Sequence, residues 1–279
     1  MVKIIADSTC NLAAEVLAKH DVRVAPITIQ FGNETYEEGI DIDRDVFYRK
    51  IEEMGIIPTT SQPTPGWFSR YYQELAAQGH QILVITITSK LSGTYQSAVL
   101  AKAMAPEADV EVFDSESISL GTGWMVLEAC QMAEAGRDRA AILSRLEKIR
   151  AGGYLFLTPA TLKYFQMSGR VGKLQGAVAS LLNVKPIIAL VDGILEAGEN
   201  VRTRGKAVER LLELIEEGVG TSDPVNLAVI HARAPEEAQD LLGKAKAKFN
   251  CREVLVGDLV CSLAVHGGPG VVGLFAYRV

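Results

Sequence analysis

Short apolar, β-branched runs alternate with segments of helical spacing along roughly the first 150 residues of this chain. Residues 2–6, 82–88 and 110–113 have the continuous apolar character of strands that are covered on both faces. Residues 43–54 and 66–77 carry apolar side chains at the spacing of an amphipathic helix. This alternation predicts an α/β fold with a doubly wound parallel sheet.

Other segments complete this first half. We expect one strand over 22–31, a loop over 58–63 because two prolines bracket it, and further helices. The expected helices cover 11–20, a segment ending near Met104, 123–135 and 138–151.

The second half predicts a different sheet. Asp192-Gly193 lies between two apolar runs, 185–191 and 194–197, and this dipeptide favours a type I′ hairpin. The sequence therefore predicts a second α/β domain with a mixed sheet, and we expect domains at 1–155 and 156–279. Its expected helices are 158–167, 177–182, 203–217 and 235–249, and its further strands are 227–231, 254–256 and 271–277.

Composition excludes several classes of protein. With 48% hydrophobic and 22% charged residues the chain is globular, and a net charge of −6 disfavours general nucleic-acid binding. Within 160–210, however, 8 basic residues face 4 acidic ones, which indicates scattered surface charge or a patch for an anion. The four cysteines form no C-x-x-C pair and no zinc spacing, and neither a signal peptide nor a membrane span is recognisable, so we expect a cytoplasmic protein without a metal.

Three predicted strands end in polar residues, and ligands of doubly wound folds bind at the carboxyl ends of strands. These ends are Asp7-Ser8-Thr9, Thr88-Ser89 and Asp114-Ser115, and Thr60-Ser61 lies in a loop that can join them. Aspartates in such positions either ligate Mg²⁺ or, more commonly, cap the next helix.

The G-x-G-x-x-G match at residues 268–273 leads into an expected strand and not into a helix, and no P-loop motif is present, which disfavours ATP or NAD binding by a standard route. His266-Gly267-Gly268-Pro269-Gly270 is either a tight turn or a loop whose amides approach an anion beside His266. Ser61 or Ser92 with His266 as base would make a hydrolase, yet Ser92 lies in L-S-G-T-Y and not in a G-x-S-x-G elbow.

Eight ordered blocks of the sequence resemble the DegV family along nearly the whole chain. They are ADST (6–9), TSQP (60–63), LSGTYQSA (91–98), FDSESISLG (113–121), SGRVGKLQG (168–176), LLNVKPI (181–187), VRTRGKA (201–207) and HGGPG (266–270). The resemblance implies a two-domain α/β protein that binds one fatty acid in an apolar tunnel between its domains. It also implies a binding subunit of a bacterial fatty acid kinase, whose separate ATP-binding subunit converts the acyl carboxylate to an acyl phosphate for phospholipid synthesis.

The same resemblance implies site residues. Thr60, Ser92 and His266 are the positions that hold the carboxylate, with Ser61, Gly93 and Thr94 in support. Arg170 and Arg202 are implied to face the kinase or the phosphoryl group. Many members have HTGPG where this chain has HGGPG, which affects only the local loop.

This family role agrees with the chemistry of the residues. At about 0.8 kcal/mol per buried methylene, a ~16-carbon tail contributes on the order of 10 kcal/mol gross, so affinity comes from the tail. Hydroxyl donors orient the head without trapping it in an ion pair, which would oppose phosphoryl transfer. We therefore expect a ligand of the palmitate, stearate or oleate class, a kinase partner and transient membrane contact. We expect no catalytic residue and no permanent cofactor in this chain. The alternatives are a serine hydrolase or acyltransferase using Ser92 and His266, and a lipid sensor without a kinase.

Overall fold

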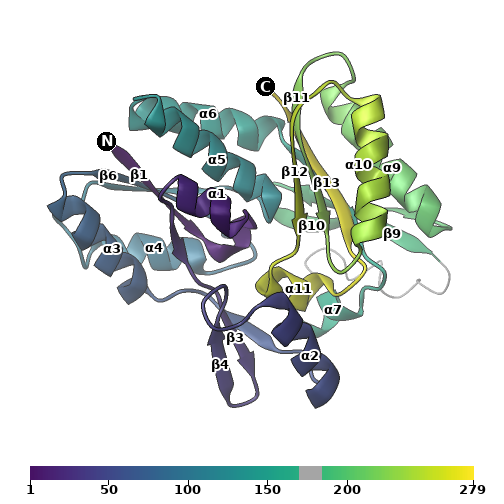
Figure 1. The fold of residues 1–279 in the computed structure, drawn as a ribbon, viewed down its shortest axis with the longest axis horizontal. Coiled ribbons are helices and arrows are strands. Elements are labelled where there is room, and N and C mark those ends of the chain that lie inside the picture. Colours follow the sequence, from purple (N-terminus) through teal and green to yellow (C-terminus); the bar gives the residue numbers. More distant parts are fainter. Residues whose placement is uncertain (170–183) are drawn as a thin grey trace. The chain divides into compact units, whose positions relative to one another are not determined.

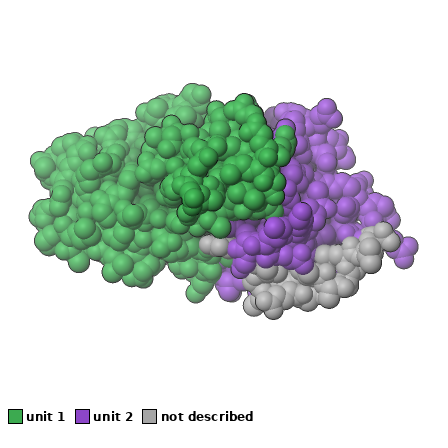
Figure 2. Space-filling model, turned by 90° about the horizontal axis from the view of Figure 1, so that it is seen from below, with its two compact units in different colours: residues 1–150, 260–262 green, residues 151–259, 263–279 purple. Residues whose placement is uncertain are grey.

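The computed structural model describes residues 1–169 and 184–279 and divides the chain into two compact units (Figures 1 and 2). Unit 1 comprises residues 1–150 and 260–262, and unit 2 comprises 151–259 and 263–279. The division thus falls a few residues before the expected position, and it groups a short segment near the C-terminus with the first unit. Among the described residues, no helix combines the length and apolar character needed to cross a membrane.

Unit 1 is built on a four-stranded parallel sheet. Its strand order is β2 (Arg23–Ala25), β1 (Val2–Asp7), β6 (Gln81–Thr86) and β7 (Val110–Asp114). Every residue from Ile82 to Thr86 is buried, as expected of a central strand.

Helices cover both faces of this sheet (Figure 1). On one face, α3 (Pro65–Ala77) and α4 (Thr94–Lys102) pack on β6, where Tyr72 shares a buried cluster with Ile82. Alternate side chains point to opposite faces of a strand, so Leu83 faces the other side, where α5 (Leu120–Glu134) lies and α6 (Arg139–Gly152) follows it. The doubly wound fold predicted from the sequence is therefore confirmed.

The expected single strand over 22–31 is wrong. Two strands occupy it: β2 joins the parallel sheet, whereas β3 (Thr28–Phe31) lies in a separate antiparallel sheet in the order β4 (Glu34–Glu37), β3, β5 (Thr59–Ser61). Pro26 separates the strands, because proline fixes φ and lacks the N–H that a continued ladder would require.

Smaller elements complete unit 1. A 3₁₀ turn, η1 (Ser8–Cys10), precedes α1 (Ala14–Lys19), which is shorter than the helix expected over 11–20. The helix α2 (Arg44–Met54) begins after Asp43, whose carboxylate accepts a hydrogen bond of 2.8 Å from the amide of Val46.

Unit 2 contains a six-stranded mixed sheet, which confirms the expected class of this half. Within the described residues, β11 and β12 are the only neighbouring strands of this sheet that pair in parallel, and all the other neighbouring pairs are antiparallel. The order is β10 (Ile194–Val201), β9 (Lys185–Val191), β8 (Tyr154–Thr158), β13 (Val272–Arg278), β11 (Val225–His231) and β12 (Cys251–Asp258).

The β9–β10 hairpin has the predicted turn. Val191 pairs with Ile194, and Asp192 and Gly193 have φ angles of 49° and 76°. Positive φ at both central residues defines a type I′ turn, and glycine adopts it without steric cost.

The expected helix over 158–167 is only partly correct. The segment starts with the end of β8, and a helix, α7 (Lys163–Met167), occupies its last turn. Leu155 and Leu157 are buried while Tyr154 is exposed, so the apolar residues of β8 serve a strand between β9 and β13. The helix expected over 177–182 lies outside the described residues.

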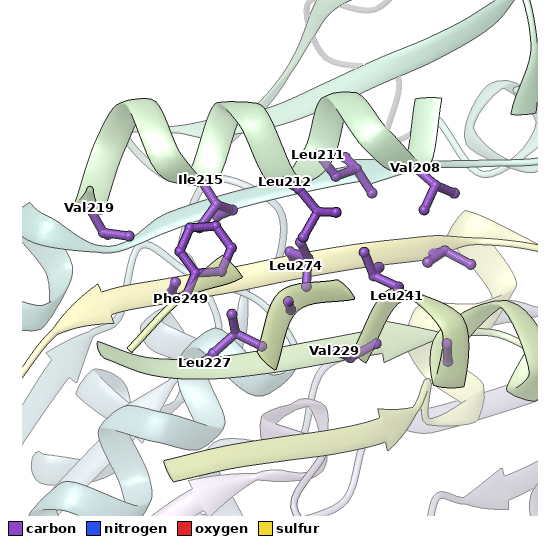
Figure 3. Close-up of a cluster of buried hydrophobic side chains, with 14 of the residues drawn as sticks. Val208, Leu211, Leu212, Ile215, Val219, Leu227, Val229, Leu241, Phe249 and Leu274 are labelled. Carbon is purple, nitrogen blue, oxygen red and sulfur yellow. The ribbon is translucent and has the colours of Figure 1, made fainter. Parts of the chain in front are cut away.

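Two helices of unit 2, α9 (Arg204–Val219) and α10 (Pro235–Lys248), pack on its sheet (Figure 3). Leu211 and Ile215 lie one helical turn apart on α9 and are fully buried with Leu227 and Leu274 of the sheet. Each such side chain contributes roughly 1.5–3 kcal/mol by leaving water, so this cluster gives unit 2 a core of its own.

Candidate functional site

Thr60 is the central residue of β5 and pairs with Ile29 of β3. Directly opposed residues of antiparallel strands point to the same face, and Ile29 is fully buried. Thr60 therefore points to the covered face of this small sheet and is half-buried, whereas Ser61 is exposed.

Ser92, Gly93 and Thr94 form the entrance to α4. The hydroxyls of Ser92 and Thr94 are 2.8 Å apart, and the amide of Thr94 donates to Ser92 Oγ at 3.3 Å. Thr94 is fully buried, while Ser92 is half-buried and keeps some access to solvent. The arrangement holds the Ser92 hydroxyl in one place at the start of the helix.

The two polar blocks of unit 1 lie side by side. A Cβ atom at Gly93 would come within 2.9 Å of Nε2 of Gln62, which directly follows β5 with its Thr60 and Ser61. The structure thus brings the TSQP and SGTY segments together, although 30 positions of sequence separate Gln62 from Ser92.

Ser92 does not lie on the kind of turn that carries the nucleophile of serine hydrolases. Among the described residues, its hydroxyl makes hydrogen bonds only with Thr94. The sharp strand-to-helix elbow of serine hydrolases is missing here because residues 87–93 separate β6 from α4.

His266 lies in the last turn of α11 (Cys261–Gly267), a helix that the sequence reasoning missed. The residue is half-buried and belongs to unit 2, whereas Thr60 and Ser92 belong to unit 1. The structure therefore describes the predicted carboxylate ligands as two separate groups, one in each unit.

The glycine loop after His266 is a tight turn and not an anion cradle. The amide of Gly268 donates to the carbonyl of Ala264 at 2.8 Å, and that of Gly270 donates to Ala232 at 2.7 Å. Pro269 has no N–H to offer. Because these amides already have backbone partners, the interpretation of the loop as an anion-binding nest is wrong for them.

Of the two arginines implied to face a kinase or a phosphoryl group, Arg202 is described by the structure and Arg170 lies outside the described residues. Arg202 is exposed between β10 and α9 and lines a pocket of about 430 Å³ together with Lys185 and Thr161. Among residues 1–169 and 184–279, no acidic residue lines this pocket and Arg202 has no ion pair.

Asp7, at the end of β1, is a structural residue. It is fully buried and accepts hydrogen bonds from the amides of Thr9 at 3.0 Å and Ile87 at 2.8 Å. Burial raises the pKa of its carboxyl, although these hydrogen bonds oppose the shift. Asp7 therefore caps η1 and joins the ends of β1 and β6, and the described residues contain no cluster of three or more potential metal ligands.

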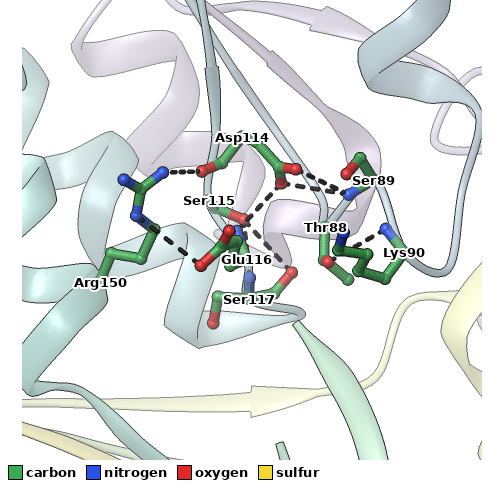
Figure 4. A network of polar contacts seen from close by, with 8 residues as sticks. All are labelled: Thr88, Ser89, Lys90, Asp114, Ser115, Glu116, Ser117 and Arg150. Atoms are coloured by element: carbon green, nitrogen blue, oxygen red, sulfur yellow. Dashed lines mark hydrogen bonds and ion pairs between the residues drawn. The ribbon is translucent and has the colours of Figure 1, made fainter. Parts of the chain in front are cut away.

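Asp114 plays the same part at the end of β7 (Figure 4). Its carboxylate accepts from the amides of Ser89 and Glu116, both at 3.1 Å, and its carbonyl accepts from Arg150 at 3.0 Å. Ser115 Oγ accepts in turn from the amide of Ser117 at 3.1 Å. The polar strand ends thus fix the loops at this edge of the sheet.

The sequence reasoning also missed Glu38, a buried acid after β4. Its carboxylate accepts from the hydroxyl of Ser8 at 2.5 Å, and from the amide and the hydroxyl of Ser262 at 2.6 and 2.7 Å. Burial raises the pKa of Glu38, and the three donors partly offset that shift. Its local sequence, Tyr-Glu-Glu-Gly, carries no signal that sets it apart from exposed acids.

These features define a class of protein: two α/β units, with neutral hydroxyl side chains gathered after β6 and on β5 of the first unit, and no P-loop motif in the sequence. A family profile described as an uncharacterised protein of the DegV family matches residues 1–279. The chain belongs to the DegV family. Protein DegV of Bacillus subtilis is 31% identical to it over 274 residues, which cover 98% of both chains.

Solved structures show the same fold. A DegV family protein of Thermus thermophilus, described as fatty acid binding, is 32% identical with a TM-score of 0.94 and covers 100% of this chain and 99% of its own. The structure of DegV of Bacillus subtilis, described as a fatty acid binding protein, is 30% identical with a TM-score of 0.91, and the match covers 100% of this chain and 99% of that one. A stearic acid-binding protein of Eubacterium ventriosum is 29% identical with a TM-score of 0.90, and the match covers 100% of this chain and 98% of that one.

Proposed function

We propose that this chain binds a long-chain fatty acid and presents its carboxylate to a separate kinase subunit, which phosphorylates it to an acyl phosphate. The observation that carries the fatty-acid part is the full-length likeness to structures described as fatty-acid-binding, in a chain that retains all three implied head-group residues. The sequence has no P-loop motif, and in this proposal the ATP site belongs to the separate kinase subunit while this chain is the binding subunit.

In this proposal Thr60, Ser92 and His266 hold the carboxylate. Thr60, on β5, and Ser92, before α4, are half-buried hydroxyls in neighbouring segments of unit 1, and both are neutral donors. Neutral donors orient a carboxylate while leaving one oxygen nucleophilic, whereas a buried arginine pair would stabilise the ground state and slow the transfer. The acyl tail lies in an apolar tunnel, and Ser61, Gly93 and Thr94 support the head-group residues.

Arg202, and Arg170 with it, face the kinase or the phosphoryl group. Arg202 is exposed and lies beside Lys185 in a pocket, and within the described part of the chain it has no ion pair and the pocket has no acidic lining, which supports this role. Guanidinium groups that are free to approach can neutralise the charge that develops on a transferred phosphoryl group.

Reconstitution with a DegV-partner kinase subunit, ATP and oleate tests the proposal. Acyl phosphate should form only when all three components are present, and Thr60→Val or Ser92→Ala should each reduce turnover by about fivefold to tenfold, the effect of one lost hydrogen bond. Ser144→Ala, at an exposed position of α6, is the matched control and should be unchanged. Ester hydrolysis by the chain alone that Ser92→Ala abolishes would overturn the proposal in favour of a hydrolase.

A further inference from the structure

Arg204, two residues after Arg202, holds three elements of unit 2 together. Its Nη2 donates to the carbonyl of Gly270 at 2.6 Å, and its Nη1 donates to the carbonyl of Thr158 at 2.9 Å. Its Nε pairs with Glu237 of α10 at 2.7 Å. The planar guanidinium serves all three acceptors at once, a geometry that lysine cannot reproduce.

The two carbonyls lie at the point where the glycine loop becomes a strand. Val272, at the start of β13, pairs with Thr158, at the end of β8. Gly270 is two residues earlier, so Arg204 closes the ladder just beyond its last pair. Backbone hydrogen bonds with Ala264 and Ala232 also hold this loop, but Arg204 supplies its link to the end of β8 at Thr158, in a segment whose glycines have the highest conformational freedom of any residue.

This link reaches His266 through a short path. The helix α11 has seven residues, too few to be stable by itself, and His266 is its penultimate residue. The position of the last turn depends on what holds the segment that follows it. That segment is held by backbone hydrogen bonds to Ala232, by Arg204 at the carbonyl of Gly270, and by the ring of Tyr164, which lies where a Cβ of Gly268 would stand.

We propose that Arg204 is a positioning residue for His266: its hydrogen bonds to Gly270 and Thr158 fix the glycine loop and thereby orient the imidazole toward the fatty-acid carboxylate. The inference rests on the proposed role of His266. It gives the two arginines of the VRTRGKA block different roles, since Arg204 is half-buried and hydrogen-bonded whereas Arg202 is exposed.

Oleate affinity and the NMR signals of the histidine rings test this in the full chain. Arg204→Lys should weaken oleate binding by about fivefold, the effect of one lost hydrogen bond, and should shift the ring signals of His266. His20 and His80, both in unit 1, are internal references and should not move. Arg252→Lys, at an exposed position of β12 in the same unit, is the matched control and should leave both affinity and the His266 signals unchanged.

A double-mutant cycle excludes a general loss of stability. Once His266→Gln has removed the imidazole, adding Arg204→Lys should cost little more affinity, because the arginine acts through the histidine. The positioning role is refuted if His266→Gln weakens binding while Arg204→Lys leaves both affinity and the ring signals as in the wild type. It is also refuted if the loss of affinity in the double variant equals the product of the losses in the two single variants. If His266→Gln leaves affinity unchanged, the carboxylate site itself is refuted. Should Arg204→Lys fail to fold, Glu237→Gln, which frees one side of the guanidinium, takes its place with the same expected signs.

Discussion

The buried carboxylate of Glu38 accepts hydrogen bonds from both the amide and the hydroxyl of Ser262, a residue 224 positions later in the chain. Asn11 makes a similar long-range link, because its side-chain oxygen accepts from the amide of Val260 at 2.7 Å. These bonds explain why residues 260–262 group with the first unit. Ser8 of the ADST block belongs to the same hydrogen-bond network, because its hydroxyl is the third donor to the carboxylate of Glu38.

Removing the Ser262 hydroxyl should destabilise the protein. Ser262→Ala leaves a buried carboxylate oxygen with one donor fewer, and a hydrogen bond to a charged group contributes about 1.5–3 kcal/mol. We expect a loss of that size in the free energy of unfolding, measured by urea denaturation. Ser144→Ala, which is exposed on α6, should change it by less than about 0.5 kcal/mol. Equal effects of the two substitutions would show that the Glu38 contacts contribute nothing.

Stability should depend on pH through Glu38. Because burial raises the pKa of Glu38 above the ordinary value of 4.5, the folded protein keeps this proton to higher pH than the unfolded chain. The free energy of unfolding therefore falls as the pH rises from 4.5 to the folded-state pKa, and the full cost of the buried charge is present above it. Asp7 acts with the same sign, because burial raises its pKa too.

Glu38→Gln removes one of these two titrations and should flatten the curve. Urea unfolding from about pH 4 to about pH 8 measures it. Glu15→Gln, at an exposed position of α1, serves as the control and should follow the wild type. Parallel curves for the wild type and Glu38→Gln would contradict the assignment.

Gly268 should not tolerate a side chain. Its φ is +73°, and a Cβ atom would come within 2.2 Å of the Tyr164 ring, so Gly268→Ala combines backbone strain with overlap. Each of these effects costs about 1–3 kcal/mol, and we expect a clear drop in the melting temperature.

A second glycine provides the matched control for this substitution. Gly205 lies in α9 with nothing within 4 Å of a Cβ, so Gly205→Ala should stabilise the protein by up to about 1 kcal/mol. If Gly268→Ala melts no lower than the wild type, the packing of the glycine loop on Tyr164 is not what fixes this turn.

Local patterns in the sequence were sufficient for most of the framework. Continuous apolar runs predict β1, β6 and β7, and the Asp192-Gly193 dipeptide predicts the hairpin, because each depends on neighbouring residues alone. The division of 22–31 had a local signal as well, in Pro26, but the β-rich residues on both sides concealed it.

The rest depends on distant parts of the chain. The strand β8 is five residues long, and both of its neighbours in the sheet, β9 and β13, come later in the sequence. Because so short an apolar run carries no clear periodicity, its own residues do not distinguish a strand from a helix. The short helix α11 is held by Glu38 at its start and by the loop on Arg204 at its end. No pattern around Glu38 or Ser262 indicates that these two residues meet. The role of Thr60, Ser92 and His266 as carboxylate ligands is predicted from the sequence only through family resemblance.

Native mass spectrometry of the purified full chain tests the central claim most directly. The account predicts a species heavier than the apoprotein by the mass of one long-chain fatty acid, and a weaker occupancy of that species in Thr60→Val and Ser92→Ala. A chain that stays at the apoprotein mass after gentle ionisation, and that takes up no added palmitate, stearate or oleate, would contradict it.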